Sequence, residues 1–127
     1  MGSAYDLYTK IFLDTDMERK SVIDIVSKVV GGSVSHSAIT AQHADMFIFN
    51  NEDFSEEKRN QEPDGFLFYR YYLEIEPRDG VEDSHYIDGI AKLLTGLWDN
   101  GLKAVASCDF EDELPRKGGY NFEGRQN

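Results

Sequence analysis

Two stretches of the chain repeat apolar residues at helical spacing, and each follows a stretch in which apolar and polar residues alternate. The first pair covers residues 5–13 and 17–30, and the second covers residues 66–76 and 84–99. Alternation with a period of two is typical of a strand, and a three- to four-residue period is typical of an amphipathic helix. Two strand–helix pairs of this kind restrict the chain to folds in which helices are layered on a sheet.

Five further segments complete the pattern. Weak alternation in residues 33–41 predicts a short strand, and the apolar run 46–49 is long enough for a buried one. Residues 50–64 form a polar, charged loop, and its length indicates that it is either functional or mobile. Residues 102–110 alternate again and predict a last strand, whereas the polar, glycine-rich stretch from Pro115 is expected to be irregular.

The predicted order is β-α-β(β)-β-α-β in a single α+β domain of 127 residues. We expect an ordered core at about residues 4–114 and a polar tail at residues 115–127. Two helices that each follow a strand, with a hairpin between, form the split βαβ pattern of a ferredoxin-like two-layer sandwich. Right-handed crossovers place both helices on one face of the antiparallel sheet, which leaves the other face open.

The charge balance restricts the class of partner. Asp and Glu total 24 against 13 Lys and Arg, which gives a net charge of −11. This charge serves solubility in many proteins, and it also favours a basic partner. It disfavours nucleic acid, which a binding protein meets with clustered Lys and Arg. We therefore expect a protein partner and no nucleic acid.

The location follows from what the chain lacks. A single cysteine, Cys108, excludes an intramolecular disulfide and is typical of a reducing compartment. No stretch approaches the roughly 18 apolar residues that a membrane span needs, and residues 4–13 alternate where a secretory signal would be continuously apolar. A cytoplasmic protein that does not bind membranes is the expectation.

No catalytic or cofactor-binding motif is present. The chain has no G-x-S-x-G, P-loop or G-x-G-x-x-G sequence, and its three histidines lie in separate segments. Residues 109–113 are the densest acidic cluster, but they lack the spacing of a calcium loop, so a metal there is a minor alternative. We expect no catalytic residues, no cofactor and no metal.

The open face of the sheet is the candidate site. Exposed rings flanked by charges are typical of protein interfaces, although an ordinary solvated sheet face is the alternative. The alternation and the acidic cluster after the last strand predict the following partner-binding residues: Tyr8, Phe12, Arg70, Tyr72, Glu74, Glu76, Asp109, Glu111 and Asp112.

The C-terminal half resembles a known type of protein. Residues 71–77, 93–98, 108–115 and 118–120 are similar in character to small acidic bacterial immunity proteins of polymorphic-toxin and contact-dependent-inhibition systems. The resemblance implies a cytoplasmic inhibitor that blocks a cognate toxin, frequently a basic nuclease, through charge and shape complementarity. It transfers no binding residues, because such interfaces diverge.

Two other functions remain open on the sequence alone. Two open sheet faces could stack, which would make the chain a homodimeric small-ligand or regulatory domain. Alternatively, Glu74, Glu76 and Asp109 could form a general acid–base set in a small enzyme. The leading hypothesis is an acidic, non-catalytic module that binds a basic protein.

Overall fold

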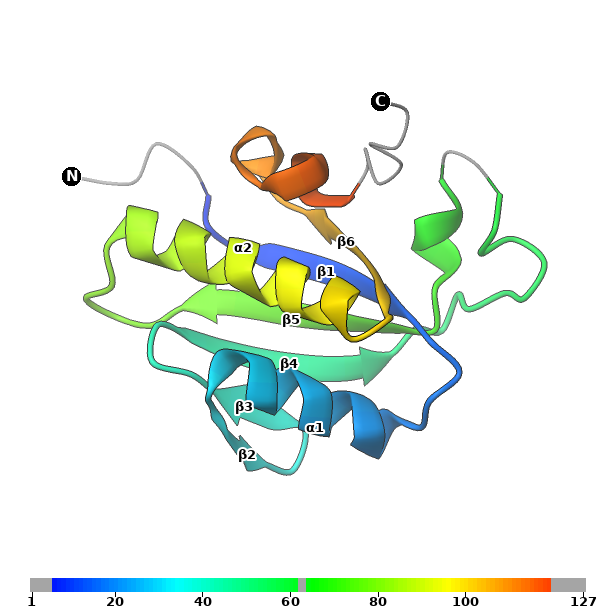
Figure 1. Ribbon diagram of the computed structural model, residues 1–127, viewed down its shortest axis with the longest axis horizontal. Coiled ribbons are helices and arrows are strands. Elements are labelled where there is room, and N and C mark those ends of the chain that lie inside the picture. The colour runs from blue at the N-terminus through cyan, green and yellow to red at the C-terminus, as the bar shows by residue number, and fades with distance from the viewer. Residues whose placement is uncertain (1–5, 62–63, 120–127) are drawn as a thin grey trace.

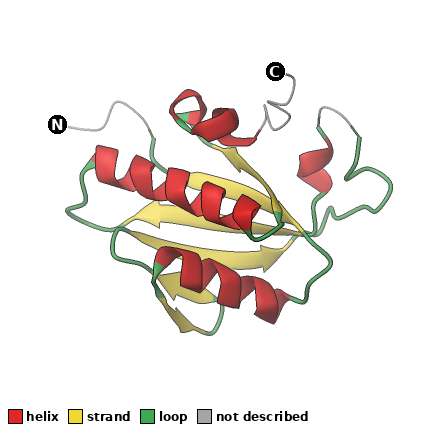
Figure 2. Cartoon of the chain, in the orientation of Figure 1, coloured by secondary structure: helices red, strands yellow, loops and turns green. Residues whose placement is uncertain are grey.

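A single six-stranded antiparallel sheet carries two α-helices on one of its faces (Figures 1 and 2). The computed structural model describes residues 6–61 and 64–119, and the counts of elements refer to these residues. The strands are β1 (Thr9–Asp14), β2 (Ser33–Ser35), β3 (Ala38–Thr40), β4 (Ala44–Asn50), β5 (Tyr71–Pro77) and β6 (Lys103–Ser107). The helices are α1 (Arg19–Val30) and α2 (Asp83–Asp99), and the 3₁₀ segments are η1 (Gly65–Phe68), η2 (Glu111–Glu113) and η3 (Pro115–Gly119).

The strand order is β2-β3-β4-β5-β1-β6, and every neighbouring pair is antiparallel. The strands that precede the two helices in the predicted strand–helix pairs, β1 and β5, pair with each other near the middle of the sheet. This arrangement confirms the predicted α+β class with two layers. The weakly alternating residues 33–41 form two short strands, β2 and β3, which extend the sheet beyond β4.

The core lies between the helices and the sheet. Strand residues at alternate positions face the helices and are almost completely buried: Ile11, Leu13, Met46, Ile48, Leu73, Ile75, Ala104 and Ala106. The helices contribute the residues that the 3.6-residue period predicts, among them Val22, Val26, Ile90, Leu93 and Leu97. The period of two in the strands therefore decides which side chains reach the core and which face away from it.

One polar network lies inside this core. The Tyr86 hydroxyl of α2 donates toward Thr9 Oγ1 (3.0 Å) and the Ile75 carbonyl oxygen (3.1 Å). The Thr9 hydroxyl in turn donates to the carbonyl oxygen of Leu7. Burial raises the pKa of Tyr86, which keeps the phenol neutral as a hydrogen-bond donor. The network joins α2 to both central strands.

The predicted strand over residues 66–76 is wrong in its first part. Residues 65–68 form the 3₁₀ segment η1, and β5 begins only at Tyr71. Strand pairing of β5 begins at Tyr71, which lies opposite Leu13 near the end of β1 and Asn50 at the end of β4. The residues before Tyr71 therefore have no paired strand on either side. The Asn51 side-chain amide donates to the carbonyl oxygens of Leu67 and Tyr69 in place of a strand ladder.

The two chain ends differ from expectation in their extent. The first strand begins at Thr9, and Tyr5, predicted on its apolar face, lies outside the described residues. The last strand ends at Ser107. The stretch expected to be irregular from Pro115 begins with η3, where Gly119 packs so closely on β6 that a Cβ would lie 2.4 Å from the Ala104 carbonyl oxygen. The tail at residues 120–127 lies outside the described residues.

Candidate functional site

The face of the sheet opposite the helices, here called the open face, gathers its side chains in three rows across the strands. The middle row aligns Phe47, Glu74, Lys10 and Ser107 from β4, β5, β1 and β6. A second row aligns Phe49, Tyr72, Phe12 and Val105 in the same strand order. In the third row, Asp45 of β4 lies directly opposite Glu76 of β5.

Aromatic rings are exposed on this face. Phe47 is 46% exposed, Phe49 is 39% exposed and Tyr8, just before β1, is 37% exposed. Phe49 stacks on Tyr72 with ring centroids 5.2 Å apart and an interplanar angle of 28°. This contact holds one exposed ring in a fixed orientation, which lowers the entropy cost of binding through it.

Among the described residues, Lys10 is the only cation in these three rows, whereas Lys103 of β6 lies opposite Asp14 toward the other end of the sheet. The Lys10 Nζ lies 4.2 Å from the centroid of the Tyr72 ring and 5.0 Å from that of Phe12. These are cation–π distances. Lys10 therefore lies over the second row of rings and forms no ion pair with a carboxylate of the described chain.

Carboxylates gather at the end of the face where β1 begins and β5 ends. Asp45, Glu74 and Glu76 make no ion pair with any other described residue. Asp109, just after β6, accepts a hydrogen bond from the Asp6 backbone N–H (3.2 Å) and so lies at the same end. We call the group Tyr8, Asp45, Phe47, Glu74 and Glu76 the exposed end of the open face.

Burial and the carboxylates of the exposed end together act on the pKa of Tyr8. Partial burial and the neighbouring Glu74 carboxylate raise the pKa of Tyr8 to about 12. Burial, Glu74 and Glu52 also raise the pKa of Tyr72. A negative charge on either phenol is disfavoured beside these carboxylates. Both tyrosines therefore remain neutral hydrogen-bond donors at physiological pH.

The opposite end of the sheet carries a cluster of arginines, here called the arginine cluster. Arg59 Nη1 lies 3.2 Å from Asp14 Oδ1, and Arg59 Nη2 lies 3.5 Å from Asp16 Oδ1. Arg70 donates from its backbone N–H to Asp14 and from Nε to the Thr15 carbonyl oxygen. The Phe54 ring lies 4.3 Å from the Arg70 guanidinium carbon and 5.3 Å from that of Arg59.

The arginine cluster joins Phe54 and Arg59 of the long loop before β5 to the sheet. The burial of Arg59 alone would lower the pKa of its guanidinium. The negative charges of Asp14, which is buried, and of Asp16 outweigh this effect and raise the pKa of Arg59 above its ordinary value. Arg59 belongs to the loop, so this ion pair joins the loop to the end of β1. The loop is fixed here by ring and carboxylate contacts to a guanidinium.

Four of the predicted site residues come together on the open face as expected: Tyr8, Tyr72, Glu74 and Glu76. Phe12 lies on the same face but is only 6% exposed. The Phe66 ring of η1 covers it in an edge-to-face contact, with centroids 5.4 Å apart. The expectation that Phe12 presents a free ring to a partner is therefore wrong, because η1 folds back over β1. No local pattern in the sequence indicates this contact.

The remaining predicted residues lie around the face. Arg70 belongs to the arginine cluster, where its backbone and side chain both serve the fold. Glu111 accepts a hydrogen bond from the Cys108 backbone N–H (3.1 Å), and Asp112 is exposed on η2. Together with Asp109 they form an acidic margin beyond β6.

Sequence reasoning missed Phe47 and Phe49, which it placed in a buried run. In β4, Ala44, Met46 and Ile48 face the core, so the two phenylalanines face the opposite way. The available signal was Asp45, which marks the outward parity of the strand two residues before Phe47. Because residues 46–49 are all apolar, the run alone does not show that Phe47 and Phe49 lie on the face opposite to Met46 and Ile48.

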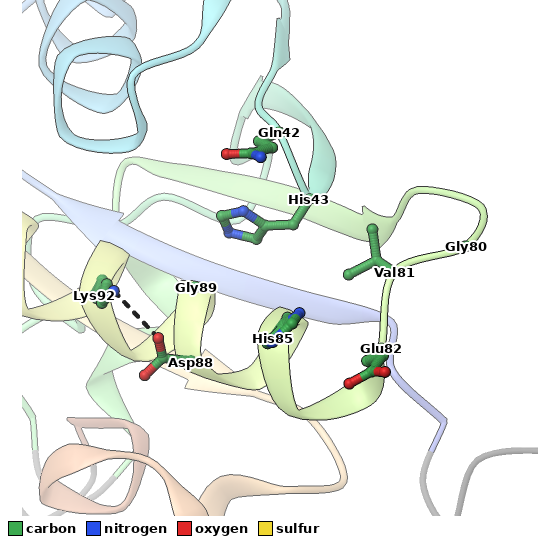
Figure 3. A pocket seen from close by; sticks show the side chains of 9 residues that line it. All are labelled: Gln42, His43, Gly80, Val81, Glu82, His85, Asp88, Gly89 and Lys92. Carbon is green, nitrogen blue, oxygen red and sulfur yellow. Dashed lines mark ion pairs between the residues drawn. The ribbon is translucent and has the colours of Figure 1, made fainter.

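A pocket lies on the helix side of the molecule (Figure 3). It has a volume of about 570 Å³ and lies between the turn before β4 and the first turns of α2. His43 packs against α2 so closely that a Cβ on Gly89 would lie 1.8 Å from its Nε2. The lining contains both carboxylates and Lys92, whose Nζ lies 3.2 Å from Asp88 Oδ2. This mixture of charges favours neither an anionic nor a cationic ligand.

Other chemistry has little support in the described part of the chain. No three His, Cys, Asp or Glu side chains there are placed to hold a metal ion, and no helix there is both long and apolar enough to cross a bilayer. Burial raises the pKa of the Cys108 thiol to about 11, so it is protonated and a poor nucleophile at neutral pH.

Known proteins offer no further guide to the site. The chain was compared with models of protein families, with curated proteins and with solved structures, and no significant match was found in any of the three. The function must therefore be argued from the open face and its charges.

Proposed function

We propose that this chain is a non-catalytic binding module that holds a positively charged protein on the open face of its sheet, as an immunity protein holds its toxin. The observation that carries the proposal is the exposed end, where Phe47 and Tyr8 lie among three carboxylates without a paired cation of the described chain. Rings supply the contact area of such interfaces, and opposite charges supply their selectivity.

The charges of the exposed end are unfavourable in the isolated chain. Asp45 and Glu76 lie directly opposite each other on neighbouring strands. Like charges in this position destabilise a sheet by a few tenths of a kcal/mol up to about 1 kcal/mol. A cationic partner would remove this repulsion, and the net charge of −11 would speed its approach at low salt.

The rings would then slow dissociation. Complete burial of a Phe side chain contributes roughly 1.5–3 kcal/mol, so Phe47 and Phe49 together would account for a large part of a tight interaction. Phe49 is already held against Tyr72, so little motion is lost when a partner covers it.

We further propose that the scaffold is a ferredoxin-like sandwich with an added hairpin. Four strands in the order β4-β5-β1-β6, with α1 after β1 and α2 after β5, support this assignment. In it, β2 and β3 are an insertion between α1 and β4. A free, protonated Cys108 agrees with a reducing compartment such as the cytoplasm.

The charges also favour a different protein over a second copy as the partner. Two open faces stacked on each other would bring Asp45, Glu74 and Glu76 of one copy toward the same residues of the other. Such a contact adds repulsion at the place where a basic partner would relieve it. The acid–base alternative is weakened because Glu74 and Glu76 lie on a wet sheet surface, where carboxylates have little catalytic leverage.

The test uses the protein encoded beside this chain, which in an immunity system is the toxin. The two are coexpressed to measure growth rescue, and their affinity is measured by calorimetry. We expect tight binding that weakens with salt, and at least a tenfold loss of affinity for the double variant F47S/F49S, since tenfold corresponds to about 1.4 kcal/mol.

The matched control is Val34→Ser. Val34 is 45% exposed, as Phe47 is, but it belongs to the peripheral strand β2, where its register with Ile39 and Met46 assigns it to the helix side. Its replacement should leave the affinity unchanged. Growth rescue and affinity that are unaffected in F47S/F49S would contradict the proposal, as would light scattering that shows a stable homodimer closed through Phe47.

A further inference from the structure

We infer that the group bound at the exposed end is an arginine side chain of the partner, with its guanidinium stacked on Phe47 and paired with Glu74 and the Asp45–Glu76 carboxylates. This inference rests on the proposed function, because it names the part of the basic partner that the open face recognises. It comes from a comparison of the exposed end with the arginine cluster of the same chain.

The arginine cluster shows how this chain holds a guanidinium. Phe54 presents its ring to Arg59 and Arg70, at 5.3 and 4.3 Å from the guanidinium carbons. Carboxylates of Asp14 and Asp16 lie 3.2–3.9 Å from the guanidinium nitrogens. The guanidinium cations are attracted to the electron-rich face of the ring, and the carboxylates accept hydrogen bonds from the N–H groups in the guanidinium plane.

The exposed end has the same components in fixed register but lacks the cation. Phe47 and Glu74 are directly opposite on β4 and β5, which places their Cβ atoms about 4.5–5.5 Å apart. Asp45 lies two residues before Phe47 on the same face of β4, opposite Glu76. A guanidinium lying over the Phe47 ring is therefore within reach of carboxylates on both strands.

No described residue supplies this guanidinium. Arg59 and Arg70 are held at the other end of the sheet, and Arg19 donates to the Ile48 carbonyl oxygen. Arg78, two residues beyond Glu76, donates from Nη1 to the Ala41 carbonyl oxygen (3.3 Å), and the Arg116 guanidinium lies over the Trp98 ring. Lys10, the nearest cation in register, lies over Tyr72 at 4.2 Å. Although Lys10 lies opposite Glu74 in register, Asp45, Glu74 and Glu76 form no ion pair with a described residue, so a partner meets carboxylates that can still accept from its guanidinium.

Arginine fits this surface better than lysine does. A guanidinium is flat, weakly hydrated and forked, so it stacks on a ring while it donates to carboxylates beside the ring. An ammonium is a hydrated point charge that gains less from the ring and cannot donate in two parallel bonds. We therefore expect discrimination between two peptides of equal charge.

The experiment is a titration of the full ¹⁵N-labelled chain with the peptide acetyl-Gly-Arg-Gly-Arg-Gly-amide, followed by NMR. The matched probes replace both arginines with lysine or with neutral citrulline. We expect weak binding of the arginine peptide, with shifts confined to residues 45–49 and 72–76, at least threefold tighter than the lysine peptide. The citrulline peptide should cause no saturable shifts.

The variant Phe47→Leu keeps an apolar side chain of similar size but removes the aromatic ring, so it distinguishes cation–π binding from simple apolar contact. This variant should bind the arginine peptide about threefold more weakly, the size of an exposed cation–π contact, and should lose the preference over lysine. Val34→Leu is the control and should bind as the unchanged chain does. Equal affinity for arginine and lysine, or shifts centred on residues 109–113, would overturn the inference.

Failure of this inference is distinguishable from failure of the proposed function. If F47S/F49S abolishes partner binding while the arginine peptide does not bind or shows no preference, the open face still binds a protein but recognises it by other groups. If the neighbouring protein does not bind at all while the arginine peptide does, the assigned partner is wrong and the arginine site stands.

Discussion

The arginine cluster and the exposed end are built from the same kinds of side chain but have opposite effects on the isolated protein. In the arginine cluster, the rings and carboxylates surround guanidinium groups of the chain itself, and the contacts join a long loop to the sheet. At the exposed end, Phe47 and three carboxylates have no such cation among the described residues. Whether such a surface stabilises a fold or offers a binding site depends on where its cation comes from.

The connecting segments account for the difference. The segment between β4 and β5 supplies Arg59 and Phe54 to one end of the sheet, and η1 places Phe66 over Phe12. At the other end, the turns before β4 and before α2 are short. These turns line the pocket on the helix side (Figure 3), and Phe47 at the exposed end stays 46% exposed among the described residues.

The largest expected difference between the two regions is in aromatic packing. Phe12→Ala should destabilise the protein by about 3–4 kcal/mol, because it leaves a cavity beneath Phe66. Phe47→Thr should cost less than about 1 kcal/mol, because the ring is half in solvent and Thr suits a strand. Urea unfolding followed by circular dichroism measures both. If Phe12→Ala does not fold, Phe12→Leu provides the milder variant, and equal costs for the two sites would contradict the comparison.

The next difference concerns the carboxylates. Asp14→Ala should cost about 3 kcal/mol, because it leaves the Arg59 guanidinium partly buried without its partner and removes an acceptor from the Arg70 N–H. Glu74→Ala, the matched change at the exposed end, should alter the unfolding free energy by less than about 0.5 kcal/mol. A large cost at Glu74 would show that it holds the fold together and is not free to bind a partner.

Much of the fold follows from local patterns. The periods of two and 3.6 residues located both helices and both central strands, because each element buries one face against the other layer. The boundaries failed where the ends of strands depend on their neighbours. Residues 66–70 continue the alternation of β5, but no strand pairs with them, and residues 65–68 form η1.

The sequence predicts the parts of the site that depend on the alternation of side chains between the two faces of a strand. It does not predict the parts that depend on contacts between distant segments. Parity placed Tyr72, Glu74 and Glu76 on one face. The contact of Phe66 with Phe12 and the pairing of Arg59 with Asp14 join segments that are more than 40 residues apart. Nothing local in the sequence distinguishes the ring that becomes buried, Phe12, from the ring that stays exposed, Phe47.

A smaller effect tests the repulsion at the exposed end. Glu76→Thr should raise the unfolding free energy by about 0.5 kcal/mol at low salt, because it removes a like charge directly opposite Asp45 and introduces a good strand former. The gain from the charge should shrink at high salt. Glu57→Thr, at an exposed position in the long loop, serves as the control for loss of one negative charge elsewhere. A loss of stability in Glu76→Thr at low salt would mean that Glu76 makes a favourable contact in the isolated chain.

The smallest effect is on the ionisation of Tyr8. Burial and Glu74 raise its pKa to about 12, so folding favours the neutral phenol, and this contribution to stability is present below pH 10 and lost as the pH rises through 12. Glu74→Gln should lower the pKa of both Tyr8 and Tyr72, as followed by NMR of the ring carbons bonded to oxygen. Glu52→Gln is the matched control, because Glu52 raises the pKa of Tyr72 and is not among the charges acting on Tyr8. If the pKa of Tyr8 does not respond to Glu74, the negative potential assigned to the exposed end is absent, and its contrast with the arginine cluster reduces to a difference in burial.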